Sequence, residues 1–162
     1  MTLPAVESEQ RIRALLTLYR ESHYDVHLAR SRVATLRVGA PAPPAVARWI
    51  AAPRIGYYLT ACNPRSQSLP PEENEERLEA LRAELRERGA AFLEGAGHIP
   101  GEAWRERSLL VRGIADDDVA ALVRRHDQNC IVVAHTDAPT TLRVFRNDWR
   151  ALVGDAPHVE WG

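Results

Sequence analysis

Residues 55–62 read IGYYLTAC, an apolar stretch rich in strand formers that favours a buried strand at the centre of a sheet. Asn63-Pro64 follows directly and predicts a turn that ends this strand. Pro71 then suits the first turn of a helix, and Gly89 suits the position just beyond its end. We therefore expect a central strand, a turn and a long helix in this order.

The segments on both sides alternate between helical and strand patterns. Helices are expected over 7–22, around 46–50 and from 116 onward, and strands over 24–28, 33–38, 91–95, 106–113, 130–135 and 141–145. A Gly/Pro-rich loop is expected at 95–104, and a short helical turn followed by a tail at 147–162. This order predicts one α+β domain over 1–162, with its core at 24–146 and a single mixed sheet of about seven strands covered by about four helices.

Composition limits the possible classes of protein. The 162 residues are 45% hydrophobic and 27% charged, which excludes disorder as the native state. Because no apolar run approaches about 20 residues, and MTLPAVESEQ (1–10) lacks the features of a signal peptide, we expect a soluble cytoplasmic protein. All 21 basic residues are arginine, which excludes Schiff-base and phosphate-loop chemistry that requires lysine.

Charge favours no macromolecular partner. The net charge is −1, which gives no overall attraction to nucleic acid or to a membrane. Residues 1–71 carry nine arginines and four acidic residues, whereas 72–106 carry five arginines and ten acidic residues. The acidic block is most simply one solvated helix face, and the basic part lacks the aromatic residues of single-strand binders. Nucleic acid is therefore an improbable partner, while a protein partner stays possible.

Cysteines and histidines indicate no metal site and no cofactor. Cys62 and Cys130 lie in apolar segments and are expected to be buried core thiols, with a nucleophilic Cys62 as the alternative. His23 and His27 lie on a predicted strand, where four residues span about 13 Å, too far to share one metal. His98 falls in the predicted loop, as a solvated or lid residue.

Candidate site residues gather in TACNPRSQSLPPEEN (60–74), which runs from the carboxyl end of the predicted central strand to a helix N-terminus. Ligands tend to bind at the carboxyl ends of strands, and the N-terminus of a helix favours anions. Arg65 offers a bidentate fork for a carboxylate or phosphate, while Thr60, Asn63 and Ser66 supply short polar groups. The segment therefore predicts an anion-binding loop.

Asn74 continues the apolar face that Leu78, Leu81 and Leu85 form on the following helix. An amide on such a face needs hydrogen-bond partners, because leaving it unpaired costs about 1–3 kcal/mol. Two interpretations stay open: Asn74 braces the preceding loop, or it points into a polar pocket beside it.

Two further polar insertions border apolar strands. WRERS (104–108) places Glu106 and Ser108 on one strand face, and HDQN (126–129) places Gln128 and Asn129 at the start of the next strand. Exposed strand ends would also explain both. Glu106 is the best candidate for a general acid or base, because a partly buried carboxyl can have a pKa near neutrality.

These segments together resemble the bacterial domain-of-unknown-function family 3293. The resemblance rests on TACNPRS, an Asn early in the next helix, WRERSLLVRGI and QNCIVV, and it covers about residues 19–145. It implies motif positions at Thr60, Ala61, Asn63, Pro64, Ser66, Asn74, Trp104, Glu106, Ser108, Gln128 and Asn129. The family pattern has Ala at the position of Cys130, which argues against a reactive thiol there. The family name implies no activity.

Three hypotheses about function follow. The first is a domain that binds a small anionic or nucleotide-like ligand through the TACNPRS loop, with Asn74 and Gln128 orienting it. The second is a hydrolase or transferase acting on such a ligand, with Glu106 as acid or base. The third is a protein-interaction module that uses the arginine-rich N-terminal part or the tryptophan-bearing tail.

Overall fold

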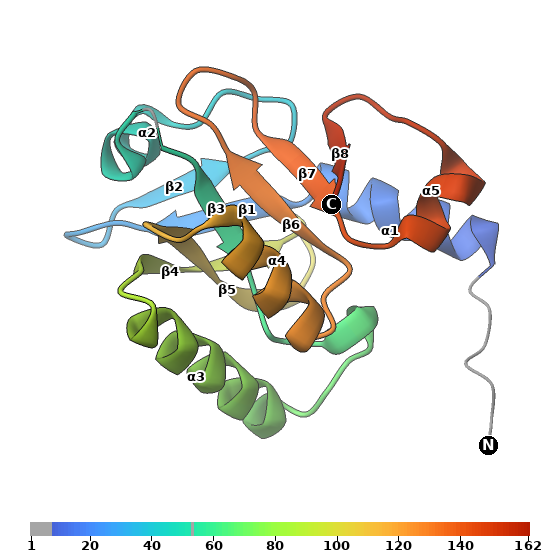
Figure 1. Ribbon diagram of the computed structural model, residues 1–162, viewed down its shortest axis with the longest axis horizontal. Helices are drawn as coiled ribbons and strands as arrows, with labels where there is room; N and C mark the ends of the chain where they lie inside the picture. The colour runs from blue at the N-terminus through green and yellow to red at the C-terminus, as the bar shows by residue number, and fades with distance from the viewer. Residues whose placement is uncertain (1–7, 53) are drawn as a thin grey trace.

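Strand β3 (Gly56–Leu59) lies near the middle of an eight-stranded sheet in the computed structural model, which describes residues 8–52 and 54–162 (Figure 1). All four residues of β3 are buried, as the apolar stretch at 55–62 predicts. The strand order is β2-β1-β4-β5-β3-β6-β7-β8. The other strands are β1 (His23–His27), β2 (Val33–Leu36), β4 (Ala91–His98), β5 (Arg105–Arg112), β6 (Cys130–Ala134), β7 (Thr141–Val144) and β8 (Val159–Trp161).

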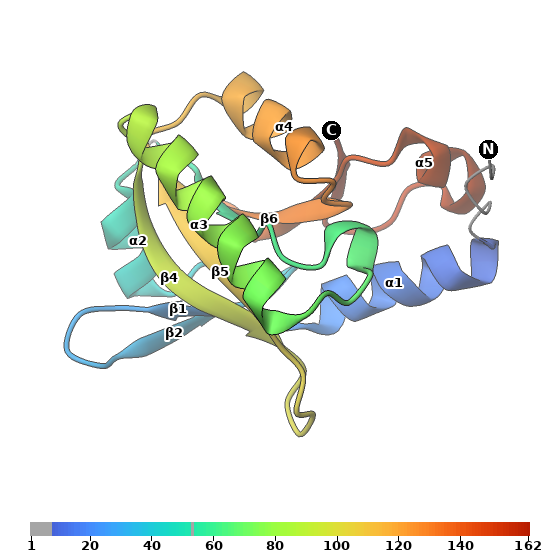
Figure 2. The same cartoon turned by 90° about the horizontal axis from the view of Figure 1, so that it is seen from below.

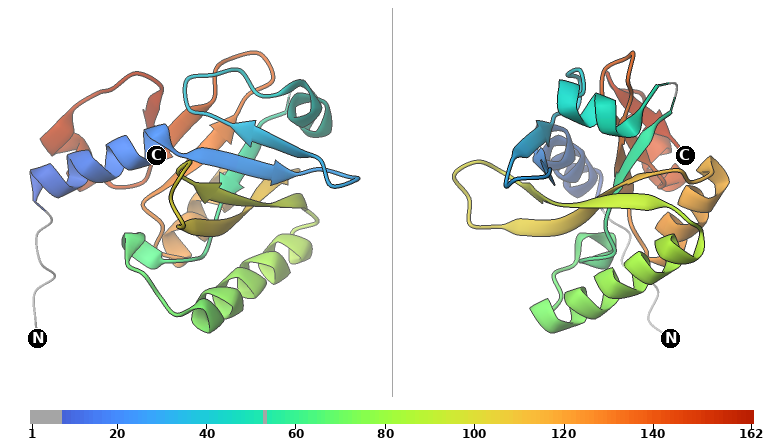
Figure 3. Two further views of the ribbon diagram at one scale, coloured as in Figure 1. Left: turned by 180° about the vertical axis from the view of Figure 1, so that it is seen from behind. Right: turned by 90° about the vertical axis from the view of Figure 1, so that its left-hand side faces the viewer.

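Helices cover both faces of this sheet (Figures 2 and 3). On one face, α3 (Pro71–Glu87) and α4 (Asp116–Arg125) bury leucines and valines against the odd-numbered residues of β3 and β5. The opposite face packs against α1 (Glu9–Glu21), α2 (Pro44–Ile50) and α5 (Asn147–Val153). This arrangement confirms the expected α+β class.

The sheet is mixed, as predicted, because β7 and β8 pair in parallel while every other neighbouring pair is antiparallel. The predicted helix boundaries also hold where capping signals exist. The Ser8 side chain accepts a hydrogen bond from the Arg11 backbone N–H at 3.2 Å at the start of α1. Pro71 begins α3, and Gly89 adopts a φ of 69° just beyond its end.

Two expectations about loops are wrong. The predicted loop at 95–104 begins later, because β4 continues through Gly95 and Gly97 to His98. Position 95 of this strand holds glycine because a Cβ there would lie 2.1 Å from the Asp25 carbonyl oxygen of β1. The close approach of β1 therefore requires glycine, and the two glycines do not mark a loop.

The predicted tail is also part of the fold. Residues 159–161 form β8, an eighth strand beside β7, and the Trp149 side chain of α5 is 0% exposed. Both the tail and its tryptophans therefore contribute to the core. Within the described residues, no helix has both the length and the apolar character needed to cross a membrane.

Candidate functional site

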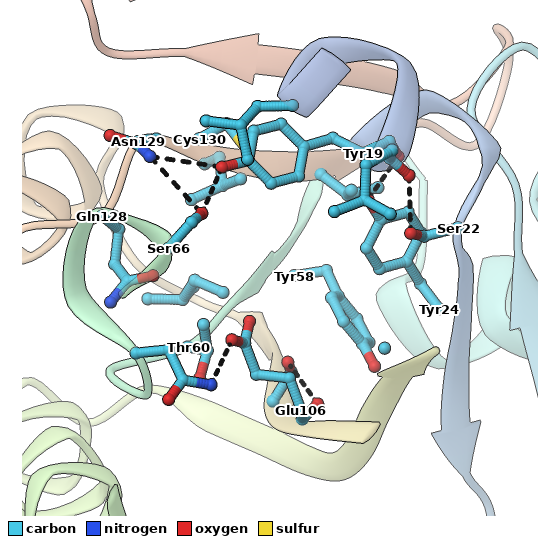
Figure 4. Close-up of a pocket in the computed structure, with 18 of the residues that line it drawn as sticks. Tyr19, Ser22, Tyr24, Tyr58, Thr60, Ser66, Glu106, Gln128, Asn129 and Cys130 are labelled. Carbon is cyan, nitrogen blue, oxygen red and sulfur yellow. Dashed lines mark hydrogen bonds between the residues drawn. The ribbon is translucent and has the colours of Figure 1, made fainter. Parts of the chain in front are cut away.

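A cavity of about 160 Å³ lies between α1 and the ends of β3, β5 and β6 (Figure 4). Its walls combine apolar and aromatic side chains with a few polar groups. Most of the residues predicted as a site from sequence line it: Thr60, Asn63, Ser66, Glu106, Ser108, Gln128 and Asn129. The other two predicted site residues, Arg65 and Asn74, do not. These residues form much of the polar side of the cavity.

Glu106 is the central polar group of this cavity. Strand β5 directs Glu106, Ser108 and Leu110 toward the α1 side of the sheet, and the Glu106 carboxyl points into the cavity (Figure 4). Its Oε2 accepts a hydrogen bond from Asn63 Nδ2 at 2.9 Å. Burial raises the pKa of Glu106 to about 7, and the Asn63 hydrogen bond offsets only part of this effect.

A second polar group lies across the cavity from Glu106 (Figure 4). The Tyr19 hydroxyl of α1 and the Ser66 hydroxyl share a short hydrogen bond, and Asn129 Nδ2 donates to the Tyr19 hydroxyl at 3.2 Å. Asn129 is buried, and its Oδ1 accepts a hydrogen bond from Arg146 at 3.1 Å. This cluster ties α1 to the 63–66 loop and to the start of β6.

The loop at 63–66 has an unusual backbone. Asn63, Arg65 and Ser66 have φ values of 45°, 54° and 58°, in the left-handed region of backbone conformation that residues other than glycine rarely adopt. Such conformations persist only where the surroundings hold them, and they cluster at functional sites. Here Arg65 N–H donates to the Asp127 carbonyl at 2.7 Å, and Gln128 Nε2 donates to the Cys62 carbonyl at 3.0 Å.

Asn74 braces this loop, the first of the two interpretations above. Its Oδ1 accepts from the Asn63 backbone N–H at 2.9 Å, and its Nδ2 donates to Asn63 Oδ1 at 2.8 Å. Nδ2 also lies 3.4 Å from the Leu69 carbonyl oxygen. Asn74 therefore fixes the residue that in turn hydrogen-bonds Glu106.

Replacement of Asn74 by alanine should lower the free energy of unfolding by about 1–3 kcal/mol, because it leaves the partly buried Asn63 N–H without its acceptor. Urea denaturation measures this loss. Glu76→Ala, on the same helix but exposed, is the control and should change stability by less than about 0.5 kcal/mol. Equal stability of the two variants would show that the bracing contacts are unimportant.

Arg65 does not take the position expected for an anion-binding side chain. Its side chain is 59% exposed and does not line the cavity, and its guanidinium lies 3.8 Å from the Asp127 carboxylate. The left-handed backbone at Arg65 accompanies this outward direction. The first turn of α3 does not line the cavity either, so the predicted contribution of the helix N-terminus is absent there.

Thr60, the two cysteines and His98 make contacts within the fold, and these contacts account for their positions. Thr60 lines the cavity, but its hydroxyl donates to the Arg107 carbonyl at 2.6 Å. Burial raises the pKa of both thiols, Cys62 and Cys130, which agrees with their interpretation as unreactive thiols. His98 is neither in a loop nor solvated, because it ends β4 and its Nε2 lies 2.9 Å from Asp25 Oδ2.

Sequence reasoning missed the aromatic wall of the cavity. Tyr19, Tyr24 and Tyr58 all line it, from α1, β1 and β3. Tyr19 occupies the apolar face of its helix, and the other two occupy strands, so each resembles an ordinary core residue in the sequence. Only its polar hydroxyl distinguishes a buried tyrosine, since that group needs a partner.

Fold and site together define the class: an α+β domain whose mixed sheet and first helix enclose a small cavity around one buried carboxyl. Residues 59–131 match the family model described as "Protein of unknown function (DUF3293)", which supports the sequence resemblance over a shorter stretch than 19–145. The segment includes Asn63, Glu106 and Asn129, whereas Tyr19 lies outside it. No curated protein and no solved structure matches the chain.

Proposed function

We propose that this domain binds a small organic molecule in the cavity, with Glu106 as its main polar contact. The observation that carries this proposal is a partly buried carboxyl that faces the cavity and accepts its one hydrogen bond within the described residues from Asn63. Burial of an ionisable group costs free energy, and the Asn63 hydrogen bond offsets only part of this cost. Perturbed carboxyls in concave sites are typical of functional groups.

The size of the cavity restricts the ligand. A protein cavity of about 150 Å³ is known to hold benzene, so about 160 Å³ accommodates one six-membered ring with a small substituent. A complete nucleotide exceeds this space. The enclosed part of the ligand is therefore a single ring or a branched chain of similar size.

The charge of the cavity changes the sequence-based hypothesis of an anionic ligand. Among the described residues that line it, none carries a positive charge, and Arg65 lies outside. Asn63 and Ser66 of the TACNPRS loop still line the cavity, so the loop keeps its part in the proposal. We therefore retain the loop and the small ligand but not the anion.

An NMR screen of single-ring fragments tests this proposal. Binding should shift the backbone amide signals of cavity residues on α1, β3 and β6, and Arg65→Ala should bind the same fragments with unchanged affinity. The original anion hypothesis predicts loss of binding in that variant. A screen without hits, or hits that shift only the surface around Asp127, would contradict the proposal.

A second candidate function is acid–base catalysis on the bound molecule by a hydrolase or transferase. It is favoured by one observation: a Glu106 pKa of about 7 suits both donation and acceptance of a proton at neutral pH. Turnover of cavity-sized esters or amides that disappears in Glu106→Gln would support it. Fragment binding without such turnover would leave binding as the function.

A further inference from the structure

The cavity side of Glu106 lacks a hydrogen-bond donor. Oε2 is occupied by Asn63 Nδ2, but within residues 8–52 and 54–162 no side chain or backbone N–H donates to Oε1. The described lining residues also supply no cation to pair with the carboxylate. Oε1 is therefore open to water or to a ligand that enters the cavity.

The three tyrosine hydroxyls beside the cavity already have hydrogen-bond partners. Tyr58 donates to the Asp25 carbonyl oxygen at 2.7 Å, Tyr24 donates to the Tyr19 carbonyl oxygen, and the Tyr19 hydroxyl bonds with Ser66. These residues thus present rings, not free donors, to the ligand. Aromatic rings attract cations through their negative faces, with a gain of about 0.5–2 kcal/mol that grows when the site is desolvated.

The following inference rests on the proposed function. We propose that the ligand carries a protonated amine, which donates a hydrogen bond to Glu106 Oε1 and forms an ion pair with this carboxylate inside the tyrosine-walled cavity. An alcohol could also donate to Oε1, but it brings no charge to neutralise the carboxylate. A ligand carboxylate would place a second negative charge beside the first. The expected order of affinity is therefore amine, then alcohol, then carboxylate.

Amine binding should depend on pH through Glu106. The ionisable groups that contact or face it are neutral near pH 7, since burial raises the pKa of each: Tyr19 of α1, Tyr24 of β1, Tyr58 of β3, Cys62 after β3, and Cys130 of β6. An alkylamine with a pKa near that of lysine, about 10.4, remains protonated at this pH. Because the amine binds the ionised carboxyl, and the free pKa is about 7, its affinity should rise about tenfold from pH 6 to pH 8.

Calorimetry with cyclohexylamine, cyclohexanol and cyclohexanecarboxylate tests this inference, because the three share one ring and differ in charge. Cyclohexylamine should bind at least tenfold more tightly than cyclohexanol at pH 8, and the carboxylate most weakly. Glu106→Gln should weaken amine binding at least tenfold while changing cyclohexanol binding less than threefold. The control is Glu102→Gln, the same substitution at an exposed position of the β4–β5 loop.

The outcomes separate this inference from the proposed function. If cyclohexanol or the carboxylate binds as tightly as the amine, the domain still binds small molecules but the amine inference is wrong. If amine binding is equal in Glu106→Gln and Glu102→Gln, Glu106 is not its partner and the inference also fails. If none of the three probes and no screened fragment enters the cavity, both proposals fail.

Discussion

Between pH 5 and pH 8, the free energy of unfolding of the wild-type protein is expected to fall by about 2.5 kcal/mol relative to that of Glu106→Gln. The folded-state pKa of Glu106 is about 7, against a usual value of 4.5, so the folded protein holds this proton more tightly than the unfolded chain. The resulting stability is fully present below pH 4.5 and is lost as pH rises through 7. Glutamine does not titrate and therefore does not lose it.

Urea denaturation of both proteins at pH 5, 6.5 and 8 measures this difference. Contributions from all other titrating groups largely cancel because they are common to the two proteins. Glu102→Gln is again the matched control, and its stability should run parallel to that of the wild type. Parallel curves for Glu106→Gln as well would mean that the Glu106 carboxyl is solvated.

Replacement of Gly95 by alanine should destabilise the fold by about 3 kcal/mol or more. The added Cβ would lie 2.1 Å from the Asp25 carbonyl oxygen and 2.8 Å from the Tyr58 hydroxyl. The first of these atoms belongs to the backbone of β1, so relief requires separation of two paired strands. Since Tyr58 donates to that same carbonyl, the change would also disturb the cavity wall.

Gly97→Ala is the control for this substitution. Gly97 lies on the same strand and faces the same side, but a Cβ there would meet Tyr24 at an ordinary 3.5 Å. Thermal unfolding should show a change of less than about 1 kcal/mol for Gly97→Ala. Similar stability of the two variants would show that β1 and β4 are not packed as closely as described.

The sequence predicts strands well where apolar residues decide the structure. The buried runs around β3 and β6 have no alternative to the interior of the sheet, and the proline and glycine signals fix the limits of α3. Strand β8 was missed because it is three residues long and pairs only at the edge, through a contact with β7. Its existence depends on tertiary packing and not on a local pattern.

The same distinction applies to the site. Strand alternation places Glu106 on one face with Ser108, which made it a candidate, but its burial depends on the packing of other elements against the end of β5. The direction of Arg65 was not identifiable, since no local rule predicts a left-handed backbone at an arginine. The sequence did not single out Tyr19 either, because its position on the apolar face of α1 is typical of an ordinary core residue.

The β4–β5 loop carries Trp104, one of the motif positions that the family resemblance implies. Trp104 precedes β5, lines the cavity and is nevertheless 40% exposed. Figure 2 shows this loop extending beyond the rest of the domain. The opening of the cavity therefore has an indole beside it, which provides a fluorescence signal for ligand entry in the screen described above.

The central proposal is that Glu106 is a partly buried carboxyl that binds a ligand, and an NMR titration of its side-chain carboxyl carbon tests this most directly. The resonance is assigned by its absence in Glu106→Gln. The account predicts a midpoint near pH 7 in the free protein, and a lower midpoint when cyclohexylamine is bound. A midpoint near the ordinary value of 4.5, unchanged by the amine, would contradict it.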